Sequence, residues 1–587
     1  MEREILFYDI ECFSHDSLVV FMNLNSEVVA YYWSTGYDKF DKPNGFEEVP
    51  KLIDGKTICG YNNHWYDDKM LSIMIRGLPQ KAIKRLNDRL ISGDPCKDFT
   101  LYPFAETLDC MQQIDVSHPS LKQIEGNMGI MVLESAIPFD IGRPLTAEEK
   151  EEVLRYCCYD VRATIRIYKL RKHSYFDPKR QLVKMLGNDK AMKWNTTTIS
   201  GNLLLQKPLP KWSKLRIPER FWRHVEGIPE DVWDMWKSAE TEDPKGKSIK
   251  LTMFGMDFVF AFGGLHGVAS AGKKWNNVKL LDVGSMYPSI VILLQALGPE
   301  STQTYDKIRR QRLAIKHTDK LLSDALKLVL NSVYGNLKNQ YSILYNPLAS
   351  VTVCVFGQIA LFDLCRELYE AGFELVNANT DGIAFIDPHF PERKELYEEI
   401  WHSWEEKWGL NLELDEFDKW IQKDVNNYVA VKPDGSVKVK GAETNKYIFD
   451  PDKGIHKLFS NNSIRIVQMA LVDCLLYEKP PVDTIIENLD KPQLFQFILK
   501  AGGTYKGVFD ADGNQAYKVN RVFAGNHRAK TTKLYKKRMD NGLVNFPDAP
   551  DKMIVWNEDC KEFKDFADYV DVNYYLQLAK KKLKGWL

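Results

Sequence analysis

The amino-acid sequence predicts a multidomain α/β protein. Its 587 residues exceed what one hydrophobic core can serve, so we expect about three to five domains. Strand-like apolar runs that deliver a carboxylate recur along the chain, at 5–11, at 280–282 and around the Asp-Gly pair at 381–382. Segments with helical spacing lie between these runs, including one that begins near residue 146.

The composition is that of an ordinary globular enzyme, with 44% hydrophobic and 27% charged residues. We expect no membrane-spanning run, and the opening Met-Glu-Arg-Glu leads into a strand rather than a secretory signal. Ten cysteines are scattered without a Cys-x-x-Cys pair, and the adjacent Cys157 and Cys158 suit buried thiols. The sequence therefore predicts a reducing, cytoplasmic compartment, with neither a zinc site nor a disulfide framework.

Positive charge is concentrated near the C-terminus, although the formal net charge is only -1. The stretch 518–538 carries eight basic residues and no acidic one, and four lysines lie within 580–584. Such a distribution is typical of a surface that binds a polyanion, with a solvated charged face as the alternative.

Carboxylates in the first 70 residues are candidate metal ligands. Strand periodicity places Asp9 and Glu11 on one face of the run 5–11, where they would repel each other without a cation between them. A divalent metal is the simplest such cation. Asp67 follows a second strand-like run that begins at Thr57.

A helix is predicted to start at a capping box formed by Thr146 and Glu149. Tyr156 and Asp160 are four residues apart on this helix and share one face. An acid on an apolar face is costly to bury unless it is paired or bound to metal, so Asp160 joins the candidates. A solvated aspartate is the alternative for each acid taken alone.

Taken in order, three motifs resemble the RNase H-like, DEDDy-type 3'-5' exonuclease domain of replicative DNA polymerases. They are Asp-x-Glu at 9–11, Asn-x-x-Tyr-Asp at 63–67 and Tyr-x-x-x-Asp at 156–160. The resemblance implies that two metal ions are held by Asp9, Glu11, Asp67 and Asp160, and that Tyr156 orients the attacking water. It also implies that the unpaired 3' end of a primer is contacted by Asn63, Ser120 and Leu121.

A second set of candidates lies in the middle of the chain. Asp282 ends a strand-like run before a Gly-Ser turn, and Asp381 is expected at the tip of a hairpin. Strand ends hold carboxylates rigidly at a cleft, although a plain surface junction is the alternative for Asp282 alone. The glycines of 262–267 let a backbone approach closely, either to a phosphate backbone or in a simple turn.

These residues belong to motifs that resemble bacteriophage family B DNA polymerases. The stretch 282–289 is similar to the first palm motif, with Met286 in place of leucine, and 327–335 is similar to the fingers motif. The resemblance implies a right-hand polymerase with palm, fingers and thumb. In it, two Mg²⁺ ions, for which Mn²⁺ can substitute, are bound by Asp282, Asp381 and the backbone carbonyl of Val283.

The fingers are expected to be two helices, at about 306–317 and 319–334, each with a polar pair four residues apart. The like charges of Arg312 and Lys316 suggest an anion between them, with two solvated side chains as the alternative. By resemblance, Lys327 clamps the triphosphate and is a candidate proton donor, and Tyr287 excludes a 2' hydroxyl. The implied nucleotide-binding set is Ser285, Met286, Tyr287, Arg312, Lys316, Lys327, Asn331 and Tyr334, and the implied DNA contacts are Gly263, Gly264, Tyr428, Lys438 and Lys440.

Two positions depart from the family pattern. Asn379 replaces the first aspartate of Asp-Thr-Asp, and Asn426 replaces the lysine of the Lys-x-Tyr element that contains Tyr428. Lys438 or Lys440, beyond a predicted hairpin at 433–435, could supply the missing cation. We expect an active enzyme with an altered rate or metal preference.

Spacing predicts a compact polymerase. Only 45 positions separate Asp282 from Lys327, and 46 separate Tyr334 from Thr380, so neither gap holds an inserted domain of the kind found in protein-primed phage polymerases. We therefore expect no built-in collar for processivity. The expected layout is exonuclease 1–170, connecting wedge 171–260, palm 261–300, fingers 301–336, second part of the palm 337–445 and a largely helical thumb 446–587.

The sequence thus predicts a template-directed DNA polymerase with 3'-5' proofreading. It would work as a monomer in the host-cell cytoplasm on primer-template DNA and deoxynucleoside triphosphates, with replisome accessory proteins as further candidate partners. An exonuclease with a weak or inactive polymerase half is the alternative. A non-catalytic nucleic-acid-binding protein is less favoured, because it would make the ordered motifs a coincidence.

Overall fold

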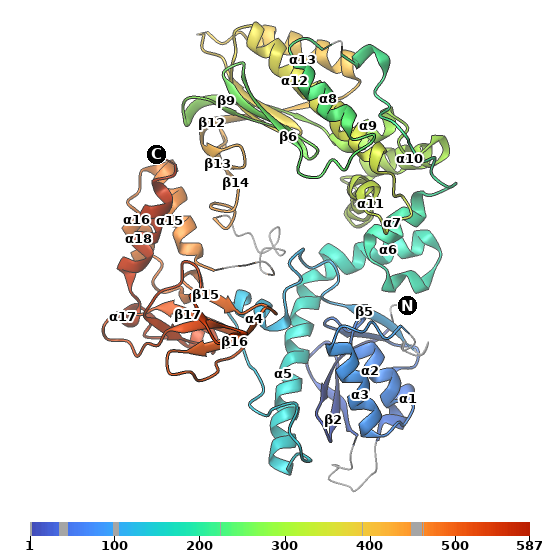
Figure 1. Ribbon diagram of the computed structural model, residues 1–587, viewed down its shortest axis with the longest axis vertical. Helices are drawn as coiled ribbons and strands as arrows, with labels where there is room; N and C mark the ends of the chain where they lie inside the picture. Colours follow the sequence, from blue (N-terminus) through green and yellow to red (C-terminus); the bar gives the residue numbers. More distant parts are fainter. Residues whose placement is uncertain are drawn as a thin grey trace.

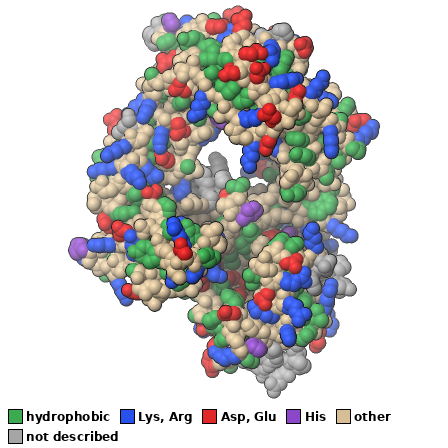
Figure 2. Space-filling view, viewed as in Figure 1, with side chains coloured by type: hydrophobic (Ala, Val, Ile, Leu, Met, Phe, Trp, Pro, Cys, Tyr) green, Lys and Arg blue, Asp and Glu red, His purple; other side chains and the backbone are tan. Residues whose placement is uncertain are grey.

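The computed structural model describes residues 3–34, 45–97, 105–223, 225–389, 391–447, 459, 461 and 463–586. It is a mixed α/β molecule in three parts (Figure 1). The N-terminal part, in blue and cyan, lies below the central part in green and yellow, and the C-terminal part, in orange and red, lies to the left. Figure 2 shows an opening between these parts.

The N-terminal part is built on a five-stranded sheet in the order β3-β2-β1-β4-β5. β1 pairs antiparallel with β2 and parallel with β4, which places the strand with Asp9 and Glu11 at the centre. The strands are β1 (Ile5–Cys12), β2 (Ser17–Met22), β3 (Val28–Trp33), β4 (Thr57–Gly60) and β5 (Glu106–Asp109). The helices of this part are α1 (Val49–Ile53), α2 (Asp67–Met74), α3 (Gln80–Ile91), α4 (Leu121–Met128) and α5 (Ala147–Arg171).

Helix α5 begins where the sequence predicts. The side chain of Thr146 accepts from the backbone of Glu149, whose own side chain accepts from the Thr146 backbone, so the predicted capping box is confirmed. The helix packs against β1 and β2. It continues through a π-helical turn, Lys172–Phe176, towards α6 (Asp177–Leu186), α7 (Thr196–Leu204) and α8 (Glu230–Ser238).

The central part is a nine-stranded sheet in the order β14-β13-β12-β9-β11-β10-β8-β7-β6. Its strands are β6 (Ser248–Met253), β7 (Met256–Ala261), β8 (Gly264–Ala269), β9 (Lys274–Val283), β10 (Glu374–Asn379), β11 (Gly382–Ile386), β12 (Leu412–Asp424), β13 (Asn427–Val431) and β14 (Val437–Lys440). Its helices are α9 (Met286–Leu293), α10 (Pro299–Ile315), α11 (Lys320–Lys338), α12 (Pro347–Glu370) and α13 (Lys394–Trp408). The two helices predicted for the fingers correspond to α10 and α11.

Two features of the central part differ from the expectations. The segment 248–261, expected in a connecting wedge, forms β6 and β7 of the sheet, joined by a turn in which Phe254 and Gly255 both have positive φ. Helix α12 is long and apolar enough to span a membrane, contrary to the prediction, but 94% of its most apolar window is buried inside the molecule. Such burial is typical of a core helix.

The C-terminal part contains more strands than the sequence predicts. Two three-stranded sheets, in the orders β15-β17-β20 and β16-β18-β19, accompany the helices, so the expectation of a largely helical segment is wrong. The strands are β15 (Phe497–Lys500), β16 (Tyr505–Asp510), β17 (Val519–Ala524), β18 (Leu534–Arg538), β19 (Leu543–Val544) and β20 (Met553–Val555). The helices are α15 (Arg465–Tyr477), α16 (Pro481–Ile486), α17 (Phe566–Tyr569) and α18 (Val572–Leu583).

Candidate active sites

Asp282 and Asp381 lie on neighbouring strands at the middle of the nine-stranded sheet. Asp282 of β9 pairs in register with Gly382 of β11, and Asp381 occupies the two-residue turn just before Gly382. The backbone N–H of Val283 donates to the Asp381 carbonyl over 2.7 Å. The structure thus brings together the two acids that the sequence pairs. The central residues of the turn are Thr380 and Asp381 rather than Asp381 and Gly382, with Thr380 at a φ of 62°.

The electrostatics of this pair favour a bound cation. Burial, followed by the charge of Asp381, raises the pKa of Asp282 to about 6. Burial also raises the pKa of Asp381. Two acids of β12 that the sequence analysis missed add negative charge: Glu413 pairs in register with Asp282, and Asp415 lies two residues further on. An all-oxygen donor set with this charge suits Mg²⁺.

Lys438 and Lys440 of β14 lie near this acidic group. Their charges oppose the rise in the pKa of Asp381, and burial lowers the pKa of Lys440. Lys438 also forms an ion pair with Asp415, with 3.5 Å between Nζ and Oδ2. The two lysines thus place positive charge near Asp381, on the strand next to the one that carries Tyr428.

The two departures from the family pattern contact each other. The side-chain amide of Asn379 donates to the Val425 carbonyl over 2.8 Å and to Oδ1 of Asn426 over 3.3 Å. An aspartate at 379 would have no proton to offer these oxygens. The two asparagines thus form one neutral pair that ties the turn at Thr380 and Asp381 to the loop before β13.

Tyr428 is buried against a neighbouring tryptophan. Its ring is stacked on Trp420, with 4.2 Å between centroids, and only 5% of the residue is exposed. The charges of Asp282 and Asp381 contribute to raising its pKa, so the ring lies beside the acidic centre. The expectation of a DNA contact is corrected to packing beneath this centre.

The start of α9 places Tyr287 against α11. Ser285 caps the helix in the left-handed region, at a φ of 53°. The rings of Tyr287 and Tyr334 are stacked 4.1 Å apart, and the Tyr287 hydroxyl donates to the Gly263 carbonyl over 3.3 Å. Met286 is only 4% exposed and packs directly on Gly357, where a Cβ would clash with its side chain. This buried side chain is unsuited to the expected nucleotide contact.

Helix α11 presents a polar stripe. Lys327, Asn331, Tyr334 and Lys338 recur every three or four residues, and the first two and the last are exposed. Lys338, which the sequence analysis missed although it continues this spacing, lies 4.2 Å from the Tyr334 ring centroid.

Helix α10 supplies the other expected phosphate contacts. Arg312 is half-buried on the helix, and Lys316 is exposed directly after its end. The Nε atom of Arg312 is buried without a hydrogen-bond partner in the described chain.

The glycine pair lies at the turn between β7 and β8. A Cβ on Gly263 would meet nothing within 4 Å, whereas one on Gly264 would lie 3.2 Å from Oγ1 of Thr380. Gly264 also has a φ of 146°, which few other residues adopt. The turn therefore abuts the hairpin of Thr380 and Asp381, and Gly263 leaves its outer surface open.

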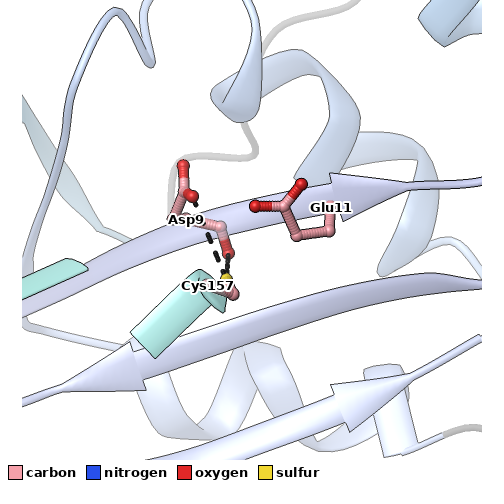
Figure 3. Close-up of side chains that lie close together, drawn as sticks. All are labelled: Asp9, Glu11 and Cys157. Carbon is pink, nitrogen blue, oxygen red and sulfur yellow. Dashed lines mark hydrogen bonds between the residues drawn. The ribbon is translucent and has the colours of Figure 1, made fainter. Parts of the chain in front are cut away.

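The N-terminal part holds a second carboxylate centre. Asp9 and Glu11 project from one strand, as predicted (Figure 3). Together with Cys157 of α5 they offer ligand atoms within 4.8 Å of one another. The thiol donates weakly to the Asp9 carbonyl over 3.6 Å. Sulfur is a poor ligand for Mg²⁺, so the oxygens are the relevant donors.

Asp67, the first residue of α2, and Asp160 of α5 complete this centre. Burial and then Asp160 raise the pKa of Asp9 to about 8. Burial and then Asp9 raise the pKa values of both Glu11 and Asp67. Burial also raises the pKa of Asp160, which a hydrogen bond with Tyr156 opposes. The four acids are thus close enough to need a compensating cation.

Lys122 of α4 supplies part of that positive charge. Its Nζ bonds Oδ1 of Asp160, lies 3.4 Å from Oε1 of Glu125, and lies 4.8 Å from the Tyr156 ring centroid. Burial works against its charge, but Asp160 and Glu125 hold the pKa of Lys122 above its ordinary value. The sequence analysis missed this residue, although it directly follows the Ser120-Leu121 pair.

The expected DNA contacts of this part fall into two groups. Asn63 is fully buried and donates to Asp68 and Thr107 over 3.0 and 2.9 Å, so a direct DNA contact is corrected to a structural role. Ser120 caps α4 through a capping box with Gln123, and Leu121 opens the helix. Both are half-buried at the same helix end as Lys122.

Comparison with known proteins gives a structural similarity alone. No protein-family model matches the chain, and no curated protein does. Among solved structures, the chain is similar to the family B DNA polymerase from the hyperthermophilic archaeon Pyrobaculum calidifontis, with 14% sequence identity and a TM-score of 0.44. The match covers 100% of this chain and 78% of that one.

Proposed function

We propose that the chain is a template-directed DNA polymerase with a separate 3'-5' exonuclease centre. The observation that carries the proposal is the pairing of Asp282 with Asp381 at the middle of the sheet. The stack of Tyr287 on Tyr334 joins this pair to the polar stripe of α11. Carboxylates that can bind a metal lie beside exposed cations that can bind phosphate, and this combination suits phosphoryl transfer.

In this proposal Asp282, Asp381 and the Val283 carbonyl would hold Mg²⁺. The metal, when bound, activates the primer 3' hydroxyl and neutralises charge on the transferring phosphoryl group. Lys327 of the stripe binds the triphosphate, with Arg312 and Lys316. The ring of Tyr287 lies against the sugar, and Asn331 and Tyr334 border the incoming base. Lys438 and Lys440 steady the primer terminus.

The exonuclease centre would hold its metal ions through Asp9, Glu11, Asp67 and Asp160. Tyr156 orients the attacking water, because its hydroxyl lies beside Asp160. Ser120 and Leu121 hold the frayed 3' end. Lys122 keeps Asp160 in place and offsets its charge.

The layout follows the three parts of the molecule. The N-terminal part is the exonuclease domain, the nine-stranded sheet is the palm, α10 and α11 are the fingers, and the C-terminal part is the thumb on duplex phosphates. Only α9 and α10 separate β9 from α11, and only α12 separates α11 from β10. Such compactness suits a monomeric bacteriophage enzyme.

Primer extension and primer degradation with Mg²⁺ test the proposal. Asp381→Ala should abolish extension and leave degradation, and Asp9→Ala should do the reverse. Because the two variants serve as each other's folding control, loss of both activities in either one would point to misfolding. Extension by Asp381→Ala at the wild-type rate would refute the polymerase assignment.

A nuclease whose polymerase half has decayed is the second candidate, favoured by the Asn379–Asn426 pair. It predicts degradation without any nucleotide incorporation by the wild-type chain, with either Mg²⁺ or Mn²⁺.

A further inference from the structure

Helix α4 belongs to the N-terminal part but is packed against the C-terminal part. It contacts both β15 and β17 and lies beside them in Figure 1. Its first turn carries Lys122, which bonds Asp160 of the nuclease centre. Its last turn lies against strands that begin more than 360 residues later in the chain. This eight-residue helix therefore links the nuclease centre to the C-terminal part.

Arg521 of β17 is the main attachment of the last turn. It is fully buried, and Nη2 donates to the carbonyls of Gly126 and Ile130 over 3.1 and 2.7 Å. Its other acceptors are Oε1 of Gln496, the Glu558 carbonyl and the Glu125 carbonyl, at 2.9, 2.6 and 3.5 Å. The C-terminal end of a helix carries partial negative charge and unpaired carbonyls, so a guanidinium there satisfies both. Without it the Ile130 carbonyl would lose its partner in the described chain, and the Gly126 carbonyl would keep only the Gly129 N–H.

Two glycines make the close approach possible. A Cβ on Gly126 would lie 2.9 Å from Cδ1 of Ile498, and one on Gly129 would lie 2.8 Å from Cδ of Gln493. Gly129 also has a φ of 74°, as the left-handed end of α4 requires. A larger side chain at either position would force Ile498 or Gln493 to shift at this contact.

The contact continues along the chain after α4. The backbone N–H of Val132 donates to the Asn557 carbonyl over 2.6 Å, and that of Cys560 donates to the Gly129 carbonyl over 2.9 Å. The Glu134 carboxylate accepts from two backbone N–H groups at the start of β17, at 2.9 and 3.1 Å. The last turn of α4 and the segment up to Glu134 are thus tied down as one unit.

We propose that Arg521 is a positioning residue for the nuclease centre, so that the C-terminal part sets the place of α4 and, through it, of Lys122 and Ser120. This inference rests on the proposed exonuclease function. In the described part of the chain α4 packs against α5, β15 and β17, whereas Asp282 and the hairpin of Asp381 belong to the nine-stranded sheet. Excision therefore depends on the C-terminal part being seated on α4, whereas the chemistry of addition does not.

The test compares Arg521→Gln with a matched control, Tyr575→Phe. The Tyr575 hydroxyl is also fully buried in the C-terminal part and makes two hydrogen bonds, to the Phe495 carbonyl and from the Ala524 N–H, neither of which involves α4. Loss of it should loosen the C-terminal part without releasing the helix. Gly126→Ala is a second variant, which crowds the contact between α4 and Ile498 while keeping Arg521.

Three measurements are made on each full-length variant: single-strand degradation with kcat and KM separated, primer extension, and amide hydrogen exchange in residues 121–130. For Arg521→Gln and Gly126→Ala we expect exchange in α4 to speed up and degradation to slow by about tenfold, as loss of one or two buried hydrogen bonds allows. A fall in kcat would indicate that Lys122 and Asp160 are displaced, and a rise in KM would indicate that Ser120 and Leu121 are displaced. Arg521→Lys, which keeps the charge, should recover part of the protection of α4 from exchange and part of the degradation rate.

The outcomes separate this inference from the proposed function. Unchanged α4 exchange and unchanged degradation in Arg521→Gln would overturn it, as would an equal loss of degradation in Tyr575→Phe. A wild-type chain that degrades no DNA would refute the exonuclease proposal. In that case the exchange data alone would decide whether Arg521 holds α4.

Discussion

The fold raises the pKa of the Asp282 carboxylate. Its pKa in the folded chain is about 6, against an ordinary value of 3.8, because of burial and then the charge of Asp381. Between these two pH values the folded state keeps a proton that the unfolded chain has lost. The contribution of this group to stability therefore falls as the pH rises from about 4 to 6, and it stays low above that range.

Asp282→Asn should accordingly stabilise the chain in metal-free buffer at pH 7. We expect a gain of about 1 kcal/mol in the free energy of unfolding, after allowance for partial exposure, and little gain at pH 4. Urea denaturation in the presence of a chelator measures it, with the exposed Glu226→Gln as a control. An equal gain at both pH values would contradict this account. Mg²⁺ should raise the melting temperature of the wild type more than that of Asp282→Asn.

The Asn379–Asn426 pair should behave as one unit. Asn379→Asp places a carboxylate against the Val425 carbonyl and Oδ1 of Asn426, so primer extension by this variant should fall. The double variant Asn379→Asp with Asn426→Lys should regain activity, because a cation then faces the acid. Rates of the two single variants and the double variant form a cycle, for which we expect a coupling of about 1 kcal/mol. Strictly additive effects would mean that the two departures are independent.

Residues of the candidate sites could be predicted where the period of a single strand or helix places their side chains on the same face. Asp9 with Glu11, and Tyr156 with Asp160, needed only the spacing within one element. Lys122 and Glu413 were not predictable in the same way. The first meets Asp160 across 38 residues, and the second meets Asp282 only because β12 pairs with β9.

The catalytic hairpin depends on a glycine for its geometry. A Cβ on Gly382 would lie 2.7 Å from Oδ1 of Asp282 and 3.3 Å from the Leu281 carbonyl, so an alanine there must displace the carboxylate. Gly382→Ala should lower primer extension by about tenfold or more and leave degradation unchanged. Gly142→Ala, which meets nothing within 4 Å, is the control. Full extension by Gly382→Ala would show that the carboxylate need not keep this position.

Single elements were predicted better than their partners in space. The capping box of α5, the hairpin at Asp381 and the two helices α10 and α11 follow from local patterns. The strands of the C-terminal part were missed because they are short and because strand pairing joins distant segments, as between β17 and β20. Strands β6 and β7 were missed although they pair with each other across a short turn at one end of the nine-stranded sheet.

The arrangement of the three parts determines which basic residues of the C-terminal segment can reach DNA. The stretch 518–538 was expected to bind a polyanion, yet one of its eight basic residues, Arg521, is fully buried against α4. Strand β18 places Lys536 and Arg538 on one face, since their positions differ by two. Lys533 and Lys581 are instead paired with Asp551 and Asp548, at 2.6 and 3.3 Å.

The salt dependence of DNA binding should distinguish these two pairs of basic residues. Each unpaired side chain that meets a phosphate releases counterions, so Lys536→Ala with Arg538→Ala should lower the slope of log affinity against log salt by about 2 and weaken binding at low salt. Lys533→Ala with Lys581→Ala removes the same net charge from the same part of the molecule. Because those charges are already neutralised by aspartates, its slope should stay near the wild-type value. Fluorescence anisotropy with a labelled primer-template duplex at several salt concentrations gives both slopes. Equal slopes for the two double variants would mean that the molecule attracts DNA through its overall charge rather than through the face of β18.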